Sequence, residues 1–371
     1  MSLKIGLRRM AALSLNKQTP SVEIARDDYL SIAKHVIAAD DNQTKNVVVS
    51  PVSIHTALCQ LAFASSGSIC AQLLTYLQSE RVEHLEPFYK HLLFKILANG
   101  SHLGGPHLSI KGGVWPDWGH TLNPAFQNSV LCHVPRMVFA DAVCFKGTWS
   151  EEFDASLTRN AGFHLLNGTA IFAPFMTSQY RQRIGTFDGF KVLKLPYVAG
   201  VDKRRFSMYI YLPDAKDGLP YLIERICCEL GFVDSHLPHE EAMVLDEFRI
   251  PKFKIGFELE ASTVLKEMGV VDLFEGGMAE IVDECLVGEV LLRALVVVDE
   301  VGTEAEGETV SAGIGLACAV MDKRPGLRFV ANHPFVFTIR EDMSRVVLFI
   351  GQLLDPLAEA SFGIFRNPDR I

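Results

Sequence analysis

The sequence lacks any long uninterrupted run of apolar residues. The longest strong candidate, residues 291–298, is interrupted by Arg293, whereas a membrane-spanning helix needs about 18–20 apolar residues in a row. We therefore expect no membrane span. Residues 10–15 are too short for the apolar core of a signal peptide, and no convincing cleavage site follows them. The sequence thus favours a cytoplasmic or nucleocytoplasmic location.

Clusters of basic residues are also scarce. The 371 residues carry a formal net charge of -9, and the densest basic run, Lys203 to Arg205, follows Asp202 in a segment that reads as a hairpin turn. Because binding to phosphates requires clustered Lys and Arg, we expect no nucleic-acid partner.

The motifs of common enzyme and metal sites are absent from the sequence. None of the eight cysteines forms a C-x-x-C pair, so free thiols are expected rather than a disulfide framework. G-x-S-x-G, H-E-x-x-H, a P-loop and a complete G-x-G-x-x-G are all missing. Gly313 and Gly315 lack the third glycine, and His239 lacks a second histidine. We expect no enzyme, no cofactor and no metal.

The elements that are present change in character along the chain. Helical spacing and capping residues predict helices over residues 21–39, from Ser50-Pro51 onward, 71–77, 85–97 and 261–268. Apolar and alternating runs predict strands at 138–144, 190–197, 205–212, 248–255, 290–299, 335–339 and 346–350. The 248–255 strand contains Pro251, which predicts an edge or a bulge. Helices first and strands mostly later indicate an α+β fold with mixed sheets.

One segment does not fit a packed domain. About thirty residues separate the strand ending at Val298 from the apolar run near Phe329, more than the roughly 12–15 residues usual for a loop. Within residues 303–315 the odd positions are all small, and the even positions include Glu304, Glu306 and Glu308. This alternation indicates a segment that can become a β-strand, because its face of small side chains could fit between two strands of an existing sheet. The alternative is a flexible acidic linker.

Several further motifs occur together in one order. They are the run from Asn46 to Ile54, Phe145-Lys146-Gly147-Thr148-Trp149, the run from Leu193 to Tyr197, the run from Phe248 to Phe253, Gly302-Thr303-Glu304-Ala305, Asn332-His333-Pro334-Phe335 and Leu348-Phe349-Ile350-Gly351 with Asp355-Pro356. In these motifs the chain resembles the serpins, and most closely the plant serpins. The resemblance covers roughly residues 21–356.

The resemblance implies the architecture. It implies one serpin-like domain over residues 21–356, of three mixed β-sheets and about eight helices, with an exposed reactive-centre loop at about 300–326. Residues 1–20 are then an N-terminal extension and 357–371 a C-terminal tail. We expect a monomer whose partner is a target serine or cysteine protease. Because the family includes secreted members, an extracellular location is the alternative.

The resemblance also implies the functional residues. The loop opens at Glu300, and its hinge comprises Gly302, Thr303, Glu304, Ala305, Glu306, Gly307 and Glu308. The usual count places the cleaved bond at Leu316-Ala317, with Ala317-Cys318 as the alternative. The region where the main sheet opens is expected to include Asn46, Ser50, Ser53 and Asp141.

The sequence departs from the family pattern in ways that bear on activity. Inhibitory hinges usually carry a run of alanines, whereas Glu306 and Glu308 interrupt it here. Between Val130 and Val138 a strand and a long helix are missing. Asp141 replaces the family's asparagine, and Leu292 stands nearest the place of its histidine. The sequence therefore leaves two functions open: an insertion-type protease inhibitor, and a non-inhibitory protein that acts as a binding module or a plain protease substrate.

Overall fold

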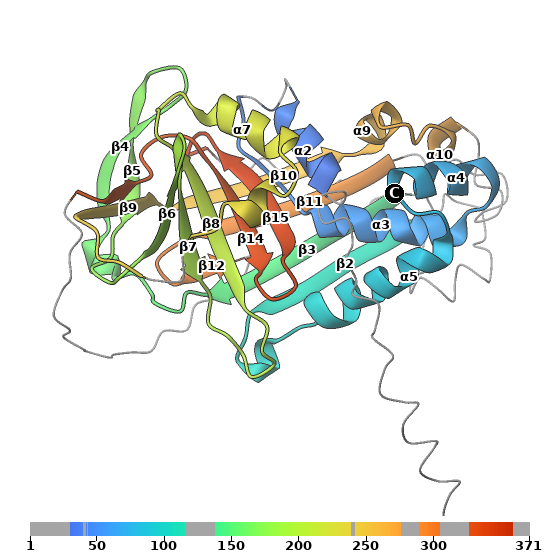
Figure 1. Cartoon of the computed structure of the whole chain (residues 1–371), viewed down its shortest axis with the longest axis horizontal. Coiled ribbons are helices and arrows are strands. Elements are labelled where there is room, and N and C mark those ends of the chain that lie inside the picture. Colours follow the sequence, from blue (N-terminus) through green and yellow to red (C-terminus); the bar gives the residue numbers. More distant parts are fainter. Residues whose placement is uncertain are drawn as a thin grey trace, which may run out of the picture.

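A computed structural model of the chain describes residues 30–39, 42, 44–115, 138–238, 242–275, 289–304 and 326–358. These residues form eight α-helices and three β-sheets (Figure 1). The helices are α2 (Ser31–Ala38), α3 (Pro51–Ala64), α4 (Gly67–Tyr76), α5 (Val82–His91), α7 (Leu219–Cys228), α8 (Phe232–Ser235), α9 (Ser262–Glu267) and α10 (Asp272–Glu275). The α+β class and the helix number expected from the sequence are confirmed.

The largest sheet has six strands and is antiparallel throughout. Its order is β1 (Val47–Val49), β15 (Val346–Leu353), β14 (Phe335–Glu341), β8 (Phe206–Pro213), β7 (Phe190–Pro196) and β6 (Arg183–Phe187). The strands β8, β14 and β15 are buried at every position. These three largely apolar strands are therefore covered on both faces.

The other two sheets are mixed. The five-stranded sheet, called here the main sheet, has the order β10 (Phe253–Glu260), β11 (Glu289–Val298), β12 (Gly302–Glu304), β3 (Val138–Thr148) and β2 (His107–Trp115). The four-stranded sheet has the order β13 (Arg328–Val330), β9 (Glu247–Pro251), β5 (Ala170–Met176) and β4 (Arg159–His164). Parallel pairs occur between β11 and β3 and between β13 and β9.

The strand predicted at residues 248–255 is wrong as a single element. It divides at Lys252 into β9 and β10, which belong to different sheets. Pro251 ends β9, and the Lys252 amide donates to the Pro174 carbonyl at 2.9 Å, so the chain leaves one sheet and enters the next. The edge position that Pro251 predicted is wrong, because the proline belongs to β9, which lies between β13 and β5.

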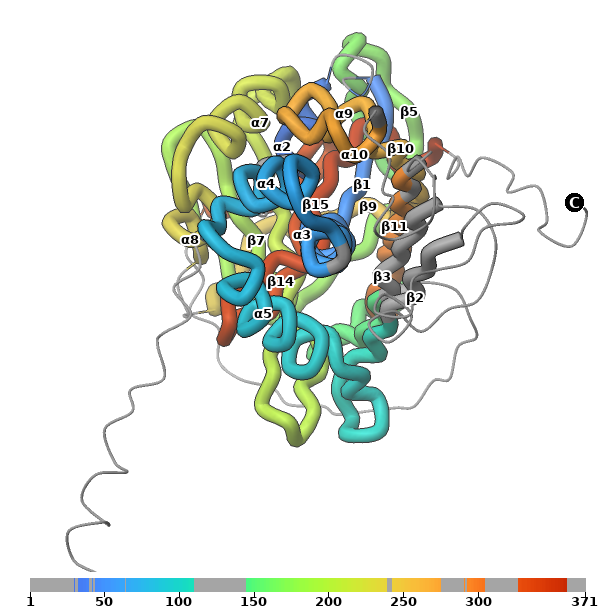
Figure 2. The backbone as a smooth tube through the Cα atoms, turned by 90° about the vertical axis from the view of Figure 1, so that its right-hand side faces the viewer, coloured from blue at the N-terminus to red at the C-terminus, as the bar shows by residue number. Residues whose placement is uncertain are grey.

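Helix α3 links the sheets. Ser50 caps its first turn by accepting a hydrogen bond from the Ser53 amide at 3.3 Å, and Pro51 occupies the first helical position. The helix packs against both β3 of the main sheet and β15 of the six-stranded sheet. Figure 2 shows β2, β3 and β11 next to one another, with α3 beside α4 and α5. In the described residues, no helix has both the length and the apolar character to cross a bilayer.

Candidate functional site

The main sheet is paired differently at its two ends. At one end β11 and β3 pair directly in parallel, from Glu289 opposite Val138 to Arg293 opposite Ala142. At the other end the short strand β12 lies between them, antiparallel to both. Residues 294–296 of β11 and 143–146 of β3 have no strand between them among the described residues. This stretch is called the open interval below.

Strand β12 contains the first residues of the predicted hinge. Gly302 lies opposite Thr148, and Thr303 lies opposite both Gly147 and Val298. Thr303 is 2% exposed. The chain therefore enters the open interval already paired to both flanking strands, and Glu304, opposite Val297, is the last described residue before the loop.

Two glycines allow this close approach. A Cβ atom on Gly302 would lie 2.0 Å from the Gly147 carbonyl oxygen, and one on Gly147 would lie 2.8 Å from the Tyr197 ring. Both distances are below any real Cβ contact, and the first is to backbone that cannot rotate away. A side chain at Gly302 would push β12 away from β3, whereas one at Gly147 would displace the Tyr197 ring.

Glu300, the predicted first residue of the loop, is held by an ion pair. Its Oε2 lies 2.6 Å from the Lys252 Nζ, and its Oε1 accepts a 2.7 Å hydrogen bond from the Thr158 hydroxyl. The Glu300 side chain is only 12% exposed. Burial alone disfavours the ionised carboxyl, but the hydrogen bonds from Lys252 and Thr158 outweigh burial and lower the pKa of Glu300 below its usual value.

An aromatic group covers the turn between β11 and β12. The Trp149 ring stacks on the Tyr197 ring with centroids 4.6 Å apart, and its Nε1 donates to the Asp299 carbonyl at 2.9 Å. The Tyr197 hydroxyl lies 2.7 Å from the Thr303 hydroxyl. The Asp299 carboxylate accepts hydrogen bonds from the amides of Val301 and Gly302 at 2.9 and 3.1 Å. The start of the loop is thus fixed by packing and hydrogen bonds together.

The predicted sheet-opening residues fall into two places. Ser50 and Ser53 lie together at the start of α3, both buried, and the Ser53 Oγ has no hydrogen-bond partner within the described residues. Asp141 lies on β3, where Leu292 of β11 is its parallel partner. Asn46 bonds elsewhere: its side chain accepts from the Leu354 and Asp355 amides and donates to the Asp355 carbonyl. It ties the chain after β15 to the start of β1.

The remaining predicted site residues lie outside the described residues. These are Ala305, Glu306, Gly307 and Glu308 of the hinge, and Leu316, Ala317 and Cys318 at the expected cleavage sites. Their roles stay predictions.

Sequence reasoning did not assign a role to several residues that hold the hinge. Lys252, Tyr197 and Trp149 occur in motifs that the chain shares with the serpins, and Thr158 occurs in none of those motifs. The available signal was composition: a lysine directly after Pro251, and aromatic residues at two strand ends. That signal does not reveal the partners, which lie 48 and 106 residues away in sequence for the Lys252–Glu300 and Tyr197–Thr303 pairs.

The chain matches one protein-family model, described as serpin (serine protease inhibitor), over residues 30–135 and 130–356. It is 37% identical to Serpin-ZX of Arabidopsis thaliana and 35% identical to Serpin-Z1C of Triticum aestivum. These comparisons cover 91% and 88% of this chain and 98% and 94% of the relatives.

Two solved structures are similar in fold. The native stressed conformation of AtSerpin1 from Arabidopsis matches with a TM-score of 0.77 and 35% identity, over 90% of this chain and 98% of that one. Uncleaved ovalbumin matches with a TM-score of 0.72 at 18% identity, over 90% of this chain and 99% of that one. The second likeness concerns the fold alone.

The comparison with Serpin-ZX shows that this chain is shorter than its relative over the aligned region. The alignment runs over 389 positions, while the covered 91% of 371 residues is about 338, so about fifty positions of the comparison have no residue here. The family match divides at residues 130–135, where the sequence predicted the loss of a strand and a helix. With the family model spanning most of the chain and plant serpins matching nearly end to end, the chain belongs to the serpin family.

Proposed function

We propose that this chain inhibits serine or cysteine endopeptidases as a suicide substrate. The protease would cleave the loop near Leu316-Ala317, and the freed loop would then insert between β11 and β3. The observation that supports this most directly is the paired start of the loop, since β12 already lies between the two strands at one end of the main sheet. Membership of a family of protease inhibitors supports the same general activity.

The register of the main sheet suits insertion without sliding. At the end of the main sheet where β11 and β3 pair directly, the paired residues differ by 151 in number, as in Glu289 and Val138. At the end where β12 lies between them, Thr303 lies opposite both Val298 and Gly147, whose numbers also differ by 151. Continuing the pairing of β12 brings residue 312 opposite Glu289 and Val138 together. The two strands therefore need only to separate at their five direct pairs, with no change of register.

The faces of the inserted strand follow from the same register. Thr303 is buried against Tyr197, so the small residues at the odd positions, from Ala305 onward, would face inward. Glu304, Glu306 and Glu308 would lie on the opposite face. On that face of β11, Leu295 and Val297 are partly exposed, whereas the alternate residues are buried.

The flanking strands would treat the three glutamates differently. Glu304 would lie between Val297 and Lys146, because Lys146 precedes Gly147 on the exposed face of β3. Glu308 would lie beside Arg293, which already pairs with Glu258 at 2.7 Å. Glu306 would lie between Leu295 and Cys144 and meet no cation. Cross-strand ion pairs stabilise a sheet by roughly 0.2–1 kcal/mol each, so only Glu306 is expected to oppose insertion.

The chemistry of the trap requires no catalytic group from this chain. The protease's serine or cysteine would add to the Leu316 carbonyl, and the bond to the Ala317 nitrogen would break with proton transfer to the new amino terminus. The resulting acyl-enzyme links the protease to the upstream part of the loop. Insertion of that part carries the protease away and disrupts its active site before water releases it.

The alternative is a non-inhibitory serpin that is a plain protease substrate. One feature of the register favours it: the unpaired charge of Glu306 would lie midway along the open interval and slow insertion. If water reaches the acyl-enzyme before insertion is complete, the protease leaves and the chain is only cleaved. The two functions therefore differ in the relative rates of insertion and deacylation.

The proposal is tested by incubating the protein with chymotrypsin, which favours a large apolar residue such as Leu before the cut. A denaturing gel and mass spectrometry then identify the products. We expect a covalent complex that survives boiling, together with a C-terminal fragment beginning at Ala317. A chymotrypsin inactivated at its serine is the matched control and forms no such complex.

Thermal unfolding of the cleaved protein supplies the second measurement. Insertion adds a central strand to the main sheet, so the melting temperature of cleaved protein should rise by roughly 5–10 °C, as expected for a gain of several kcal/mol in a chain of this length. Complete cleavage with no complex and an unchanged melting temperature would exclude the inhibitor. Cleavage with a raised melting temperature but no complex would assign the substrate function.

A further inference from the structure

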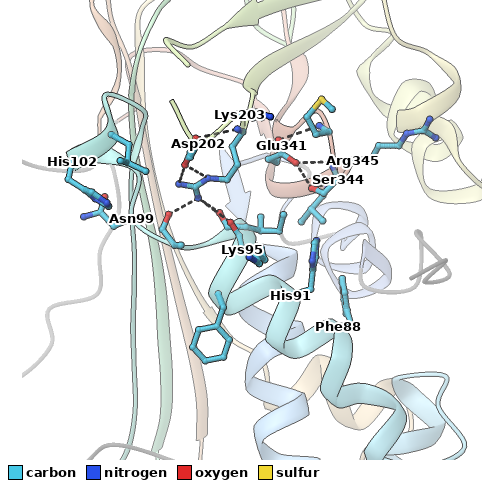
Figure 3. A pocket seen from close by; sticks show the side chains of 17 residues that line it. Phe88, His91, Lys95, Asn99, His102, Asp202, Lys203, Glu341, Ser344 and Arg345 are labelled. Carbon is cyan, nitrogen blue, oxygen red and sulfur yellow. Dashed lines mark hydrogen bonds and ion pairs between the residues drawn. The ribbon is translucent and has the colours of Figure 1, made fainter. Parts of the chain in front are cut away.

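A cavity of about 890 Å³ lies away from the hinge. Its walls are the helical end that follows α5, the turn between β7 and β8, and the turn between β14 and β15. Figure 3 shows Phe88 and His91 on the helical wall facing the turn with Glu341 and Ser344, and Lys95 opposite Asp202 and Lys203. The volume is within the range of small-molecule sites.

One wall is held in place by Arg204. Its guanidinium donates to the Asp202 carboxylate at 2.5 and 2.7 Å, and to the carbonyls of Ile96 and Ala98 at 2.8 and 2.6 Å. The β7–β8 turn also approaches the segment before β2 closely at Gly200 and Gly105. A Cβ on Gly200 would lie 2.8 Å from the Gly105 nitrogen. This wall is preformed.

The opposite wall is held by Glu341. Its carboxylate is 1% exposed and accepts hydrogen bonds from the amides of Arg205, Met343 and Ser344, and from the Ser344 hydroxyl. These bonds fix the β14–β15 turn, in which Arg345 has a φ of 65°. The Glu341 carboxylate is engaged by hydrogen bonds from the β14–β15 turn, and the Asp202 carboxylate by its ion pair with Arg204. Neither carboxylate is therefore available to bind a cation.

The remaining charges on the cavity are positive. Lys95 and Lys203 are exposed, and within the described residues neither takes part in an ion pair. Arg345 has only a 3.9 Å contact with Asp234. This positive excess stands out on a chain whose net charge is -9, and it favours a negatively charged ligand.

The same cavity exposes large apolar side chains. Phe94 and Met343, from opposite walls, are each 69% exposed. Phe94 and Lys95 belong to a π-helical turn, Leu92–Ile96, a rare conformation that is frequent at functional sites. The π-helical turn thus contributes both an aromatic residue and a lysine to the cavity lining.

We propose that this cavity binds a small amphipathic organic anion, with an aromatic or aliphatic body and one carboxylate or phosphate group. Lys95 and Lys203 bind the anionic group, and Phe94 and Met343 cover the apolar body. The walls need no rearrangement, because Arg204 and Glu341 already hold them. None of these residues belongs to the predicted hinge.

Titration calorimetry on the full chain tests the proposal. The probes are 1-naphthyl phosphate, 1-naphthaleneacetate, the neutral 1-naphthalenemethanol and inorganic phosphate. We expect one molecule of each naphthyl anion to bind at least about tenfold more tightly than the alcohol and than inorganic phosphate at low salt, with the difference shrinking as salt screens the lysines. The order of the two anions then assigns phosphate or carboxylate as the preferred group.

Two double variants locate the site. Lys95→Ala with Lys203→Ala should weaken both naphthyl anions about tenfold, since each exposed ion pair contributes up to about 1 kcal/mol. Phe94→Ser with Met343→Ser should weaken the anions and the alcohol alike. The matched control, Lys45→Ala with Lys254→Ala, removes the same charge from two exposed lysines outside the cavity and should change nothing.

Three results would overturn the proposal. They are the absence of saturable binding by either naphthyl anion, equal affinity for the anions and the alcohol, and equal weakening in the two double-lysine variants. Circular dichroism of each variant establishes that it is folded before its binding is compared.

Discussion

The hydroxyl of Tyr197 lies 2.7 Å from the hydroxyl of Thr303, and this bond joins the six-stranded sheet side of the molecule to the first residues of the hinge. Both side chains are buried, and burial raises the pKa of Tyr197 above its usual value, so the phenol stays neutral at physiological pH. The start of the loop is therefore anchored by a neutral hydrogen bond that salt does not screen.

A double-mutant cycle measures the strength of this anchor. Thr303→Val leaves the Tyr197 hydroxyl buried without its partner, so we expect a loss of about 1–2 kcal/mol in the free energy of unfolding. Tyr197→Phe combined with Thr303→Val removes both polar groups and should recover about half of that loss. Urea unfolding checks the prediction, and strictly additive effects of the two substitutions would contradict it.

The Glu300–Lys252 pair predicts a dependence of stability on acid pH. The pKa of Glu300 is lowered in the folded state, so its stabilising contribution is complete above the unfolded value of about 4.5 and is lost as pH falls through the folded value. Glu300→Gln should therefore cost about 1–2 kcal/mol at pH 7, and the difference from the original protein should shrink below pH 4.5.

His55 titrates in an overlapping range and must be separated from this effect. Burial lowers its pKa to about 4, so its contribution is also lost as pH falls, between about 6.5 and 4. Because His55 is present in both proteins, the difference between the original protein and Glu300→Gln isolates the carboxylate. A difference that stays constant from pH 7 to pH 3 would show that Glu300 acts only by packing.

Gly302 is expected to be intolerant of any side chain. Gly302→Ala would bring a Cβ to 2.0 Å from the Gly147 carbonyl, so β12 must leave β3, at a cost of about 2–3 kcal/mol. Faster hydrogen exchange at the Gly147 and Thr148 amides would report the loss. Gly162→Ala in β4 is the matched control, because nothing lies within 4 Å of its added Cβ, and it should change stability by less than about 1 kcal/mol.

The sequence predicted the elements that depend on local signals. The cap at Ser50 and the proline after it start α3 as expected, and the apolar runs at residues 138–144 and 290–299 are the central strands β3 and β11. The alternation of small residues from Thr303 predicted a strand over residues 303–315; only Thr303 and Glu304 of that segment are described, as part of β12, so the prediction for the rest remains untested.

Long-range relationships could not be predicted in the same way. Residues 248–255 divide at Lys252 between two sheets, β9 in one and β10 in the other. The alternation of apolar residues would be the same for one continuous strand, so the sequence does not reveal the division. The sequence shows that Glu306 and Glu308 interrupt the hinge, but it does not show which residues would flank them on insertion. If the register of β12 continues on insertion, Lys146 would lie beside Glu304 and Arg293 beside Glu308, and Glu306 would be the one glutamate with no cation directly opposite it.

The last prediction follows from that continued register. Glu306→Ala should raise the ratio of covalent complex to cleaved product, by about threefold, because it removes the one hinge carboxylate expected to have no cation beside it. Glu304→Ala and Glu308→Ala should leave the ratio unchanged or lower it, because each removes an expected cross-strand partner of Lys146 or Arg293. All three substitutions remove the same charge from the same strand face, so each serves as a control for the others.

The densities of the two bands on a denaturing gel, at fixed protease and salt, give the ratio for each variant. Raising the salt should bring the three variants closer together, since screening weakens both repulsion and pairing. An equal rise for all three would mean that the glutamates act by mutual repulsion alone and that the register continued from β12 is not the one adopted on insertion. No change in any variant would mean that deacylation does not compete with insertion. The hinge charges would then have no influence on the ratio of covalent complex to cleaved product.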